Sequence, residues 1–274
     1  LNGLPSALLL AGMLLLLFSM AFKASVAPFH FWTPDVYDGA PTVFTSFMAT
    51  IVKAAVFVAF IRLFDEAFGN LHHKWKLTIA LITVATLFIG NITAVFQQSV
   101  KRMLAYSSIS QAGFMLLAIY SMNTDGKEGL LLYVLAYSLA TIGLFAVLAK
   151  MSDYSYDGFN GLARQQPFLA LLITIFVLSL SGIPLTAGFL SKFLMLKATL
   201  AAGGSLWLVI VAVVMAVISI SYYFRILQAM YFKNPEKENI ITVSPAFKWT
   251  LAVLAALLIL LGIFPNLVFG FYYF

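Results

Sequence analysis

The sequence predicts an all-α polytopic membrane protein with about eight transmembrane helices, two of them broken, and three observations support this fold class. Hydrophobic residues fill 62% of the 274 positions and charged residues 9%, against roughly 45–50% and about 25% in an average soluble domain. Apolar runs such as 7–22, 207–220 and 251–263 are unbroken, which is typical of membrane helices rather than alternating barrel strands. Because one span needs about 20 residues, the chain has room for eight or nine.

Glycine, proline and charge clusters divide the chain into eight apolar segments. They cover residues 5–33, 42–64, 77–97, 102–121, 129–151, 167–200, 205–232 and 247–270. The loops after the odd-numbered segments carry more lysine and arginine than the opposite loops, so we expect them in the cytoplasm and both termini on the outer side. No basic region precedes the first segment, which is therefore predicted to be a span rather than a signal peptide. No repeat, linker or soluble domain is visible in the sequence.

Several chemistries have no residues to support them. The chain contains no cysteine, so it offers no thiolate for an iron–sulfur cluster and no thioether attachment for haem. It also lacks a phosphate-binding glycine loop, an HExxH motif, a cluster of metal-ligating side chains and a nucleophile elbow. The net charge of +6 fits cytoplasmic loops better than a nucleic-acid site. We expect no cofactor, metal or nucleic acid on this chain, and any redox centre to lie elsewhere.

Two lysines stand where a charge is costly. Lys23 falls in the middle third of the first segment, and Lys53 is the twelfth residue of the 23-residue second segment. A lysine at a helix centre costs about 2.5–3.5 kcal/mol on insertion scales. Snorkelling explains Arg62 and Lys197 near segment ends, but from mid-depth an ammonium would have to reach roughly 15 Å to leave the ~30 Å hydrocarbon core. Lys23 and Lys53 are therefore predicted to be functional, with an inert structural role as the alternative.

Lys192 lies beside a predicted break in the sixth segment, whose 34 residues are too many for one straight span. Pro184 lacks an amide donor and clashes with the carbonyl of Leu180, and the glycines at 182 and 188 let the chain leave helical angles. The two halves, about 22 and 20 Å long, are each too short to cross. We expect one broken helix with Lys192 near the membrane midplane, as at ion sites in transporters. An ordinary proline kink is the alternative.

The first segment has the same character, because Pro28 disturbs the backbone near Ala24, one residue from Lys23. Irregular backbone at that depth is tolerated only against protein or water, so each break is predicted to line a hydrated cavity. Polar groups between the lysines are candidate proton relays, although each also has an ordinary structural role as its alternative. They are His30 on the first segment, Ser107, Ser108, Ser110 and Gln111 on the fourth, and Tyr137, Ser138 and Thr141 on the fifth.

The acidic residues all fall in loops or at segment ends, so no intramembrane lysine is expected to have a carboxylate partner in this chain. They are Asp35, Asp38, Asp65, Glu66, Asp125, Glu128, Asp153, Asp157, Glu236 and Glu238. A carboxylate favours the charged form of a neighbouring lysine. A carboxylate on another segment or subunit, moving toward or away from a lysine, is therefore expected to load and unload its proton.

Three stretches of the sequence resemble a known family. Residues 22–41 read FKASVAPFHFWTPDVYDGAP, residues 100–110 read VKRMLAYSSIS, and residues 178–193 read LSLSGIPLTAGFLSKF. Together with Lys53, these motifs closely resemble the antiporter-like N subunit of respiratory complex I, the proton-pumping NADH:quinone oxidoreductase. The WTPDVY string at 32–37 separates this subunit from its two larger antiporter-like relatives.

The resemblance implies a fourteen-span subunit built on two inverted five-helix repeats, of which this chain looks like the last eight spans. Residues 1–70 would then hold the last two helices of the first repeat, 71–235 the second repeat, and 236–274 a C-terminal transmembrane helix. By the same likeness Lys23, Lys53 and Lys192 occupy the positions of the proton-carrying lysines. The helix whose glutamate pairs with the lysine at position 23 belongs to the part of the family that is absent here.

The function that the resemblance implies is proton translocation coupled to electron transfer in other subunits of the complex. NADH, FMN, iron–sulfur clusters and quinone are expected in those partner subunits, and only protons and water are expected as substrates of this chain. The expected location is the bacterial inner membrane, with lipid and other membrane-arm subunits as neighbours. Three alternatives remain: a multi-subunit cation/proton antiporter, a related complex with a different electron donor, and a structural spacer with inert lysines.

Overall fold

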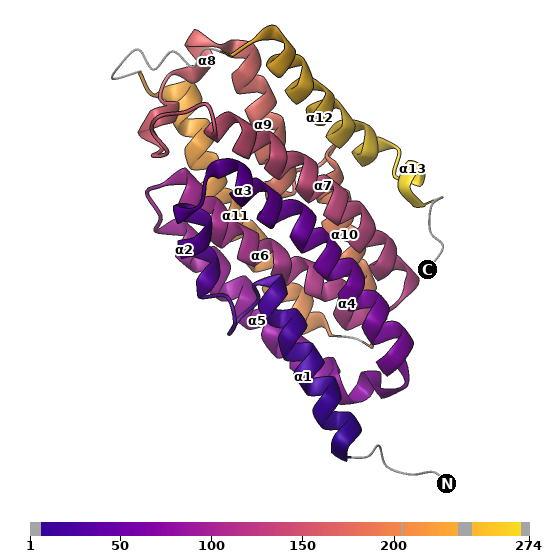
Figure 1. Cartoon of the computed structure of the whole chain (residues 1–274). Coiled ribbons are helices and arrows are strands. Elements are labelled where there is room, and N and C mark those ends of the chain that lie inside the picture. Colours follow the sequence, from indigo (N-terminus) through magenta and orange to yellow (C-terminus); the bar gives the residue numbers. More distant parts are fainter. Residues whose placement is uncertain (1–6, 204, 235–242, 270–274) are drawn as a thin grey trace.

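The computed structural model describes residues 7–203, 205–234 and 243–269, which form a bundle of long helices running in one general direction (Figure 1). The N-terminal half contains α1 (Ala7–Ala24), α2 (Trp32–Gly39), α3 (Thr42–Phe47), a π-helical turn (Met48–Val52), α4 (Lys53–Phe68), a 3-10 turn (Gly69–Leu71), α5 (His72–Val95) and α6 (Val100–Ser121). The remainder contains α7 (Thr124–Leu148), a 3-10 turn (Asp157–Phe159), α8 (Leu162–Gln165), α9 (Pro167–Ser181), α10 (Ala187–Ala201), α11 (Leu206–Phe232), α12 (Pro245–Ile263) and α13 (Asn266–Phe269). The prediction of an all-α membrane fold is confirmed.

Six helical stretches are long and apolar enough to cross a membrane, and one of them, Thr42–Val95, has 54 residues. The 3-10 turn Gly69–Leu71 divides that stretch into α5 and a preceding part made of α3, the π-helical turn and α4, each long enough for one span. The helix Pro167–Ser181 is apolar but too short to cross alone, as expected for half of a broken helix. The exact count of eight crossings stays a prediction. Residues 5–6 of the first predicted segment, residue 270 of the last one, and 235–242 of the loop before it lie outside the described residues.

Both predicted breaks are present. α1 ends at Ala24, and an irregular stretch with Ser25 at φ +62° leads to α2. α9 ends at Ser181, followed by Gly182 at φ +80°, a left-handed conformation that glycine adopts without a steric penalty. The π-helical turn Met48–Val52 was not predicted, since the sequence there reads as uninterrupted helix. The chain between α7 and α9, expected to be a loop, includes α8 and a short 3-10 turn.

Side-chain caps fix where several helices begin. Ser99 accepts from the amide of Arg102 at the start of α6, and Asn123 accepts from Gly126 at the start of α7. Thr186 starts α10 in the same way, by accepting from the amide of Phe189. Each cap satisfies an amide that has no partner inside its own helix. The restart of the broken helix at Ala187 therefore has a local cause in its sequence.

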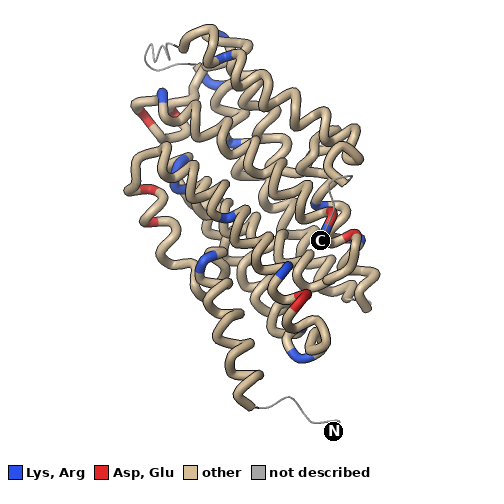
Figure 2. The backbone as a smooth tube through the Cα atoms, turned by 45° about the vertical axis from the view of Figure 1, so that its right-hand side comes forward, with Lys and Arg blue, Asp and Glu red and all other residues tan. Residues whose placement is uncertain are grey.

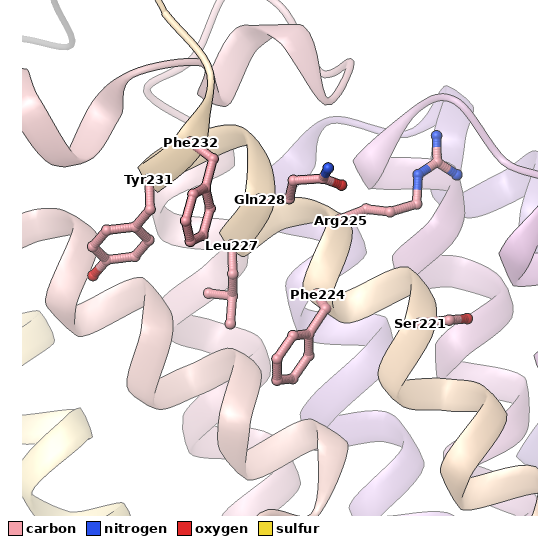
Figure 3. Close-up of a pocket in the computed structure, with 7 residues that line it drawn as sticks. All are labelled: Ser221, Phe224, Arg225, Leu227, Gln228, Tyr231 and Phe232. Carbon is pink, nitrogen blue, oxygen red and sulfur yellow. The ribbon is translucent and has the colours of Figure 1, made fainter.

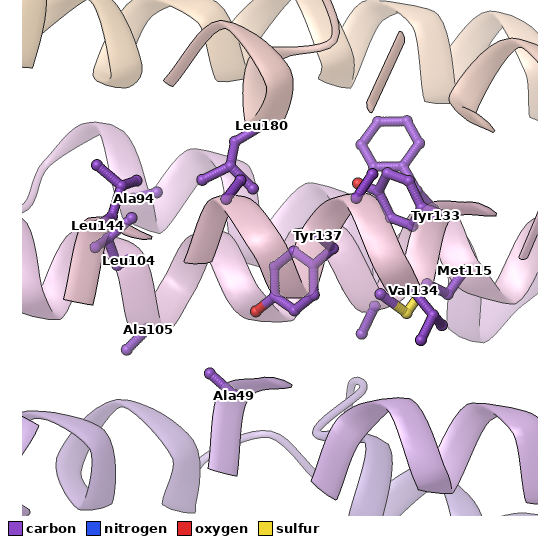
Figure 4. Packing of buried hydrophobic residues seen from close by; sticks show 14 of the residues in the cluster. Ala49, Ala94, Leu104, Ala105, Met115, Tyr133, Val134, Tyr137, Leu144 and Leu180 are labelled. Carbon is purple, nitrogen blue, oxygen red and sulfur yellow. The ribbon is translucent and has the colours of Figure 1, made fainter. Parts of the chain in front are cut away.

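α6 is the central helix of the bundle, because nearly all of its residues are buried. Its approach to α5 depends on Gly90, where an added Cβ would lie 2.6 Å from the backbone nitrogen of Ser110. Buried apolar side chains fill the layers on either side, with Leu180, Tyr133 and Tyr137 facing the same interior region (Figure 4). α1 and α12, in contrast, lie at the margins of the bundle and expose most of their surface (Figure 1).

Candidate functional site

Lys53 is the first residue of α4, immediately after the π-helical turn, and it is 1% exposed. Its ammonium donates to the hydroxyl of Ser108 at 2.5 Å and to the carbonyl of the same residue at 2.6 Å. A π turn adds one residue to a helical turn and is frequent at functional sites. The site therefore consists of a buried lysine at a helix irregularity that binds two neutral oxygens on the central helix.

Lys192 lies in the second turn of α10 and is 5% exposed. Its Nζ donates to the carbonyl oxygen of Leu180 at 2.8 Å and lies 4.6 Å from the centroid of the Phe114 ring. In a continuous helix the Leu180 carbonyl would accept from the amide of residue 184. Pro184 has no such amide, so the break in the helix provides the oxygen that Lys192 binds.

Neither lysine has a carboxylate oxygen within 4.0 Å of its ammonium among the described residues. The ion pairs join other residues, most of them near helix ends: Arg102 with Asp35 and Asp38, Lys127 with Asp65, Lys197 with Asp125, and Lys233 with Asp157. Figure 2 shows acidic segments toward the ends of the helices and some basic segments between them. In the loop pair, hydrogen bonds from Asn160 and Lys233 hold the pKa of the Asp157 carboxyl below its ordinary value.

The third predicted lysine has different surroundings. Lys23 lies in the last turn of α1, and its side chain is exposed in the part of the chain that the structure describes. α1 packs against α4, the helix that begins with Lys53. The structure therefore brings both Lys53 and Lys192 against α6, at Ser108 and Phe114, but does not bring Lys23 to either of them.

Of the eight relay candidates, all but the half-buried Ser138 are buried, and three of them, Ser108, Tyr137 and His30, show how their surroundings differ. Ser108 holds the ammonium of Lys53, as described above. Tyr137 on α7 is 4% exposed, and its ring stacks on Tyr133 with centroids 6.4 Å apart. His30 lies between α1 and α2, and its Nδ1 is buried without a hydrogen-bond partner among the described residues. Of these three residues only Ser108 contacts a predicted proton-carrying lysine directly.

Two tyrosines of the site were not found from the sequence. Tyr223 on α11 hydrogen-bonds to Ser107, and Tyr133 on α7 hydrogen-bonds to the side-chain oxygen of Gln111. Both are buried, and both join α6 residues that the sequence did single out. In the sequence of an apolar helix, a tyrosine that faces the protein interior looks the same as one at the membrane interface. Only the packing of the helices distinguishes these two positions.

A shallow groove of about 640 Å³ lies on the outer side of α11 and is lined by seven residues of that helix, with neither buried lysine among them (Figure 3). Its charged member, Arg225, donates to the carbonyls of Val95 and Gln97 at 3.1 Å and to the side chain of Gln98 at 3.0 Å. The guanidinium also lies 4.0 Å from the centroid of the Tyr156 ring. Arg225 therefore ties α11 to the turn between α5 and α6.

Two buried lysines at interrupted helices, inside a bundle of apolar helices, define a multi-pass membrane protein with an antiporter-like fold. The model of the family described as NADH:quinone oxidoreductase/Mrp antiporter, transmembrane, matches residues 1–219. The chain belongs to this family.

The relatives are bacterial. The chain is 40% identical over 276 residues to NADH-quinone oxidoreductase subunit N of Trichlorobacter lovleyi, covering 98% of this chain and 56% of that one. A respiratory complex I structure from Thermus thermophilus with bound aureothin contains a chain that is 38% identical and has a TM-score of 0.85. That match covers 98% of this chain and 60% of the other. A chain of the Mrp complex from a Dietzia species shares the fold, with a TM-score of 0.87 at 21% identity. That match covers 96% of this chain and 58% of the other. The chain spans little more than half the length of these relatives.

Proposed function

We propose that this chain is a proton-translocating part of the membrane arm of an NADH:quinone oxidoreductase. The observation that carries the proposal is that Lys53 and Lys192 are each buried at a helix irregularity and bind neutral oxygens. A buried lysine that is neither paired with a carboxylate nor able to reach water is costly in its charged form. Such a residue is suited to gaining and losing a proton during a cycle.

In this proposal Lys23, Lys53 and Lys192 carry the protons, and Ser108, Tyr137 and His30 connect them through water. Moving one charge against 100 mV requires about 2.3 kcal/mol. One pKa unit corresponds to about 1.4 kcal/mol, so a change of two to three units between the loaded and unloaded states is sufficient. The carboxylate that drives this change would come from a segment or subunit outside the described chain, because Asp65 and Asp125 are bound to Lys127 and Lys197 and no described carboxylate lies within 4.0 Å of Lys53 or Lys192.

The names of the relatives support the assignment of partners. Electron transfer, with NADH, FMN, iron–sulfur clusters and quinone, would take place in other subunits, and this chain would lie among them in the inner membrane of a bacterium. The proposed division of the chain is two helices of a first repeat in 1–70, a second five-helix repeat in 71–235 and a last transmembrane helix in 236–274. The Cys-free sequence is consistent with this arrangement.

The test is NADH-driven proton uptake, measured beside quinone reduction in inverted membrane vesicles. The assembled complex with Lys53→Met or Lys192→Met is expected to lose most of its proton uptake and its coupled electron transfer. Lys197→Met is the matched control, because Lys197 lies on the same helix as Lys192 but is exposed and paired with Asp125 at 2.9 Å. Unchanged proton uptake in both Lys53→Met and Lys192→Met would show that these lysines are structural.

A second candidate is a subunit of a multi-subunit cation/proton antiporter, which the family description also covers. The two functions differ in their energy source. Sodium-dependent proton transport by the purified complex in the absence of NADH would favour the antiporter. A related complex with another electron donor is the remaining candidate, and mass spectrometry of the subunits that copurify with this chain distinguishes it.

A further inference from the structure

The side-chain amide of Gln111 is the meeting point of four helices. Its Nε2 donates to the Leu180 carbonyl of α9 at 3.0 Å and to the Tyr223 hydroxyl of α11 at 2.9 Å. Its Oε1 accepts from the Tyr133 hydroxyl of α7. Gln111 itself lies on α6 and is 1% exposed, so no water is needed to complete these bonds.

The hydrogen-bond partners determine which way this amide points. An amide nitrogen offers two donors and its oxygen accepts, and a main-chain carbonyl can only accept. With the orientation described, both N–H groups and the oxygen of Gln111 are bonded, and Tyr223 is free to donate to Ser107. The reverse orientation would place two oxygens face to face at Leu180. The Leu180 carbonyl, which can only accept, therefore fixes the orientation of the amide, and Tyr133 donates to the amide oxygen on the other side.

The Leu180 carbonyl also binds Lys192, at 2.8 Å. A carbonyl oxygen has two lone pairs, and Pro184 leaves both without the usual helical donor. Gln111 and Lys192 thus share one acceptor. When Lys192 moves or changes its charge, Gln111 keeps the carbonyl bonded, and a buried carbonyl without any donor would be costly.

α6 connects this acceptor to the other lysine. Ser108, which binds Lys53, lies three residues before Gln111, so the two side chains share one face of the helix about one turn apart. Ser107, beside Ser108, bonds the same tyrosine as Gln111. The surroundings of Lys53 and Lys192 are therefore joined through one turn of one buried helix.

We propose that Gln111 is a positioning residue for proton transfer, which holds the Leu180 carbonyl in place through the loaded and unloaded states of Lys192. The inference rests on the proposed function, since it assigns a role within the same proton path. Gln111 does not carry the proton. It sets the place to which the ammonium of Lys192 returns and links that place to Ser107 and Ser108.

Other titratable groups lie on the helices that pack against α10. On the helices packed around α10 they are Tyr133, Tyr137, Asp125, Lys127 and Glu128 of α7, Lys101 and Arg102 of α6, Tyr222, Tyr223 and Arg225 of α11, and Lys248 of α12. No carboxylate among the described residues lies within 4.0 Å of the Lys192 ammonium. A carboxylate introduced at position 111 would thus be a new charge beside Lys192.

The test compares Gln111→Leu, Gln111→Glu and Tyr133→Phe in the assembled complex, with NADH-driven proton uptake in inverted vesicles measured against pH. Gln111→Leu removes all three hydrogen bonds of the amide, and the loss of the one to the Leu180 carbonyl is expected to lower the maximal rate about tenfold. Gln111→Glu replaces the N–H that holds the Leu180 carbonyl with an oxygen, so its rate is expected to fall about as much as in Gln111→Leu, with the optimum about one pH unit higher, because a carboxylate favours the charged form of a nearby lysine. Tyr133→Phe, which leaves the buried Oε1 of Gln111 without its donor, is expected to lower the rate about threefold.

Ser191→Ala is the control. Ser191 is the buried neighbour of Lys192, but its hydroxyl bonds only carbonyls of its own helix, those of Ala187 and Gly188. Its rate and pH profile are expected to match the wild type. Assembly is checked by native gel, and if Gln111→Leu does not assemble, the Glu and Tyr133→Phe variants decide.

Two results separate the failure of this inference from the failure of the proposed function. If Lys192→Met abolishes uptake while Gln111→Glu keeps the wild-type rate and pH profile and Tyr133→Phe keeps the wild-type rate, Gln111 only joins helices and the inference is wrong. If Lys53→Met and Lys192→Met both pump normally, the proposed function itself is wrong and this inference falls with it.

Discussion

Lys53 contacts a single residue of the neighbouring helix twice, because its ammonium donates to both the hydroxyl and the main-chain carbonyl of Ser108. α6 is buried along nearly its whole length, so these two oxygens are held by packing on every side. Both are neutral. They reduce the cost of a buried ammonium without cancelling its charge, which keeps the charge of Lys53 sensitive to any carboxylate that approaches.

Removing the Ser108 hydroxyl should therefore weaken the binding of the Lys53 ammonium without abolishing it. Ser108→Ala removes one acceptor and leaves the carbonyl, and a hydrogen bond to a charged group contributes about 1.5–3 kcal/mol. We expect NADH-driven proton uptake to fall roughly tenfold, less than in Lys53→Met. Thr83→Val on α5 is a suitable control, since its buried hydroxyl bonds only the Ile79 carbonyl of its own helix. Equal uptake in Ser108→Ala and the wild type would contradict this assignment.

The break before α10 gives a second prediction. Gly182 has φ +80°, and an added Cβ would lie 3.1 Å from Cδ of Lys192 and 3.5 Å from its Nζ. Gly182→Ala should therefore cost about 1–2 kcal/mol from the backbone alone and also displace the lysine. We expect a lower thermal unfolding midpoint and a strong loss of proton uptake.

Gly12→Ala provides the matched comparison, because an added Cβ there meets nothing within 4 Å and α1 is helical at that position. Alanine is favoured over glycine in a helix by about 0.5–1 kcal/mol, so the control should be unchanged or slightly more stable. A Gly182→Ala complex that melts and pumps like the Gly12→Ala complex would show that the left-handed turn is not needed.

The positions of the two buried lysines follow from the sequence because local energetics are sufficient to find them. A lysine at the centre of an apolar segment is costly wherever it points, and Pro184 with Gly182 breaks a helix irrespective of its neighbours. Lys53 and Lys192 are therefore recognisable in one sequence, as is the Leu180 carbonyl, which loses its helical donor to Pro184.

The partners of these lysines do not follow from the sequence. Ser108 lies 55 positions from Lys53, and Tyr223 lies 112 positions from Gln111. Which polar residue of an apolar helix faces which neighbour depends on how the helices rotate and pack. The π-helical turn before Lys53 is equally hidden, because the residues at 48–52, MATIV, contain neither proline nor glycine.

The ion pair between Lys127 and Asp65 should behave differently from the buried lysines. It joins α7 to α4, and its side chains are 20% and 40% exposed. A partly exposed pair contributes about 0–1 kcal/mol. We expect Lys127→Met, Asp65→Asn and the double variant to pump within about twofold of the wild type, the difference that 0.4 kcal/mol makes. A loss as large as that of Lys53→Met in any of them would place this pair on the proton path.

Lys101 is a buried lysine with a structural role, and it provides the last prediction. Its ammonium donates to the carbonyls of Asp38 at 2.8 Å and Ala40 at 2.7 Å, and it lies 5.3 Å from the centroid of the Tyr154 ring. The carbonyls at the C-terminal end of a helix carry partial negative charge, so Lys101 holds the end of α2 against α6.

Lys101→Met should release that end, because two charge-assisted hydrogen bonds are lost from a buried position, at a cost of about 2–4 kcal/mol. Hydrogen exchange of the amides in 32–41 is expected to accelerate strongly. Arg102→Met is the comparison, since Arg102 is more exposed and pairs with Asp35 and Asp38 on the same helix; its loss should cost less than about 1 kcal/mol. Equal acceleration in the two variants would mean that the surface ion pairs, and not the buried ammonium, hold α2 in place.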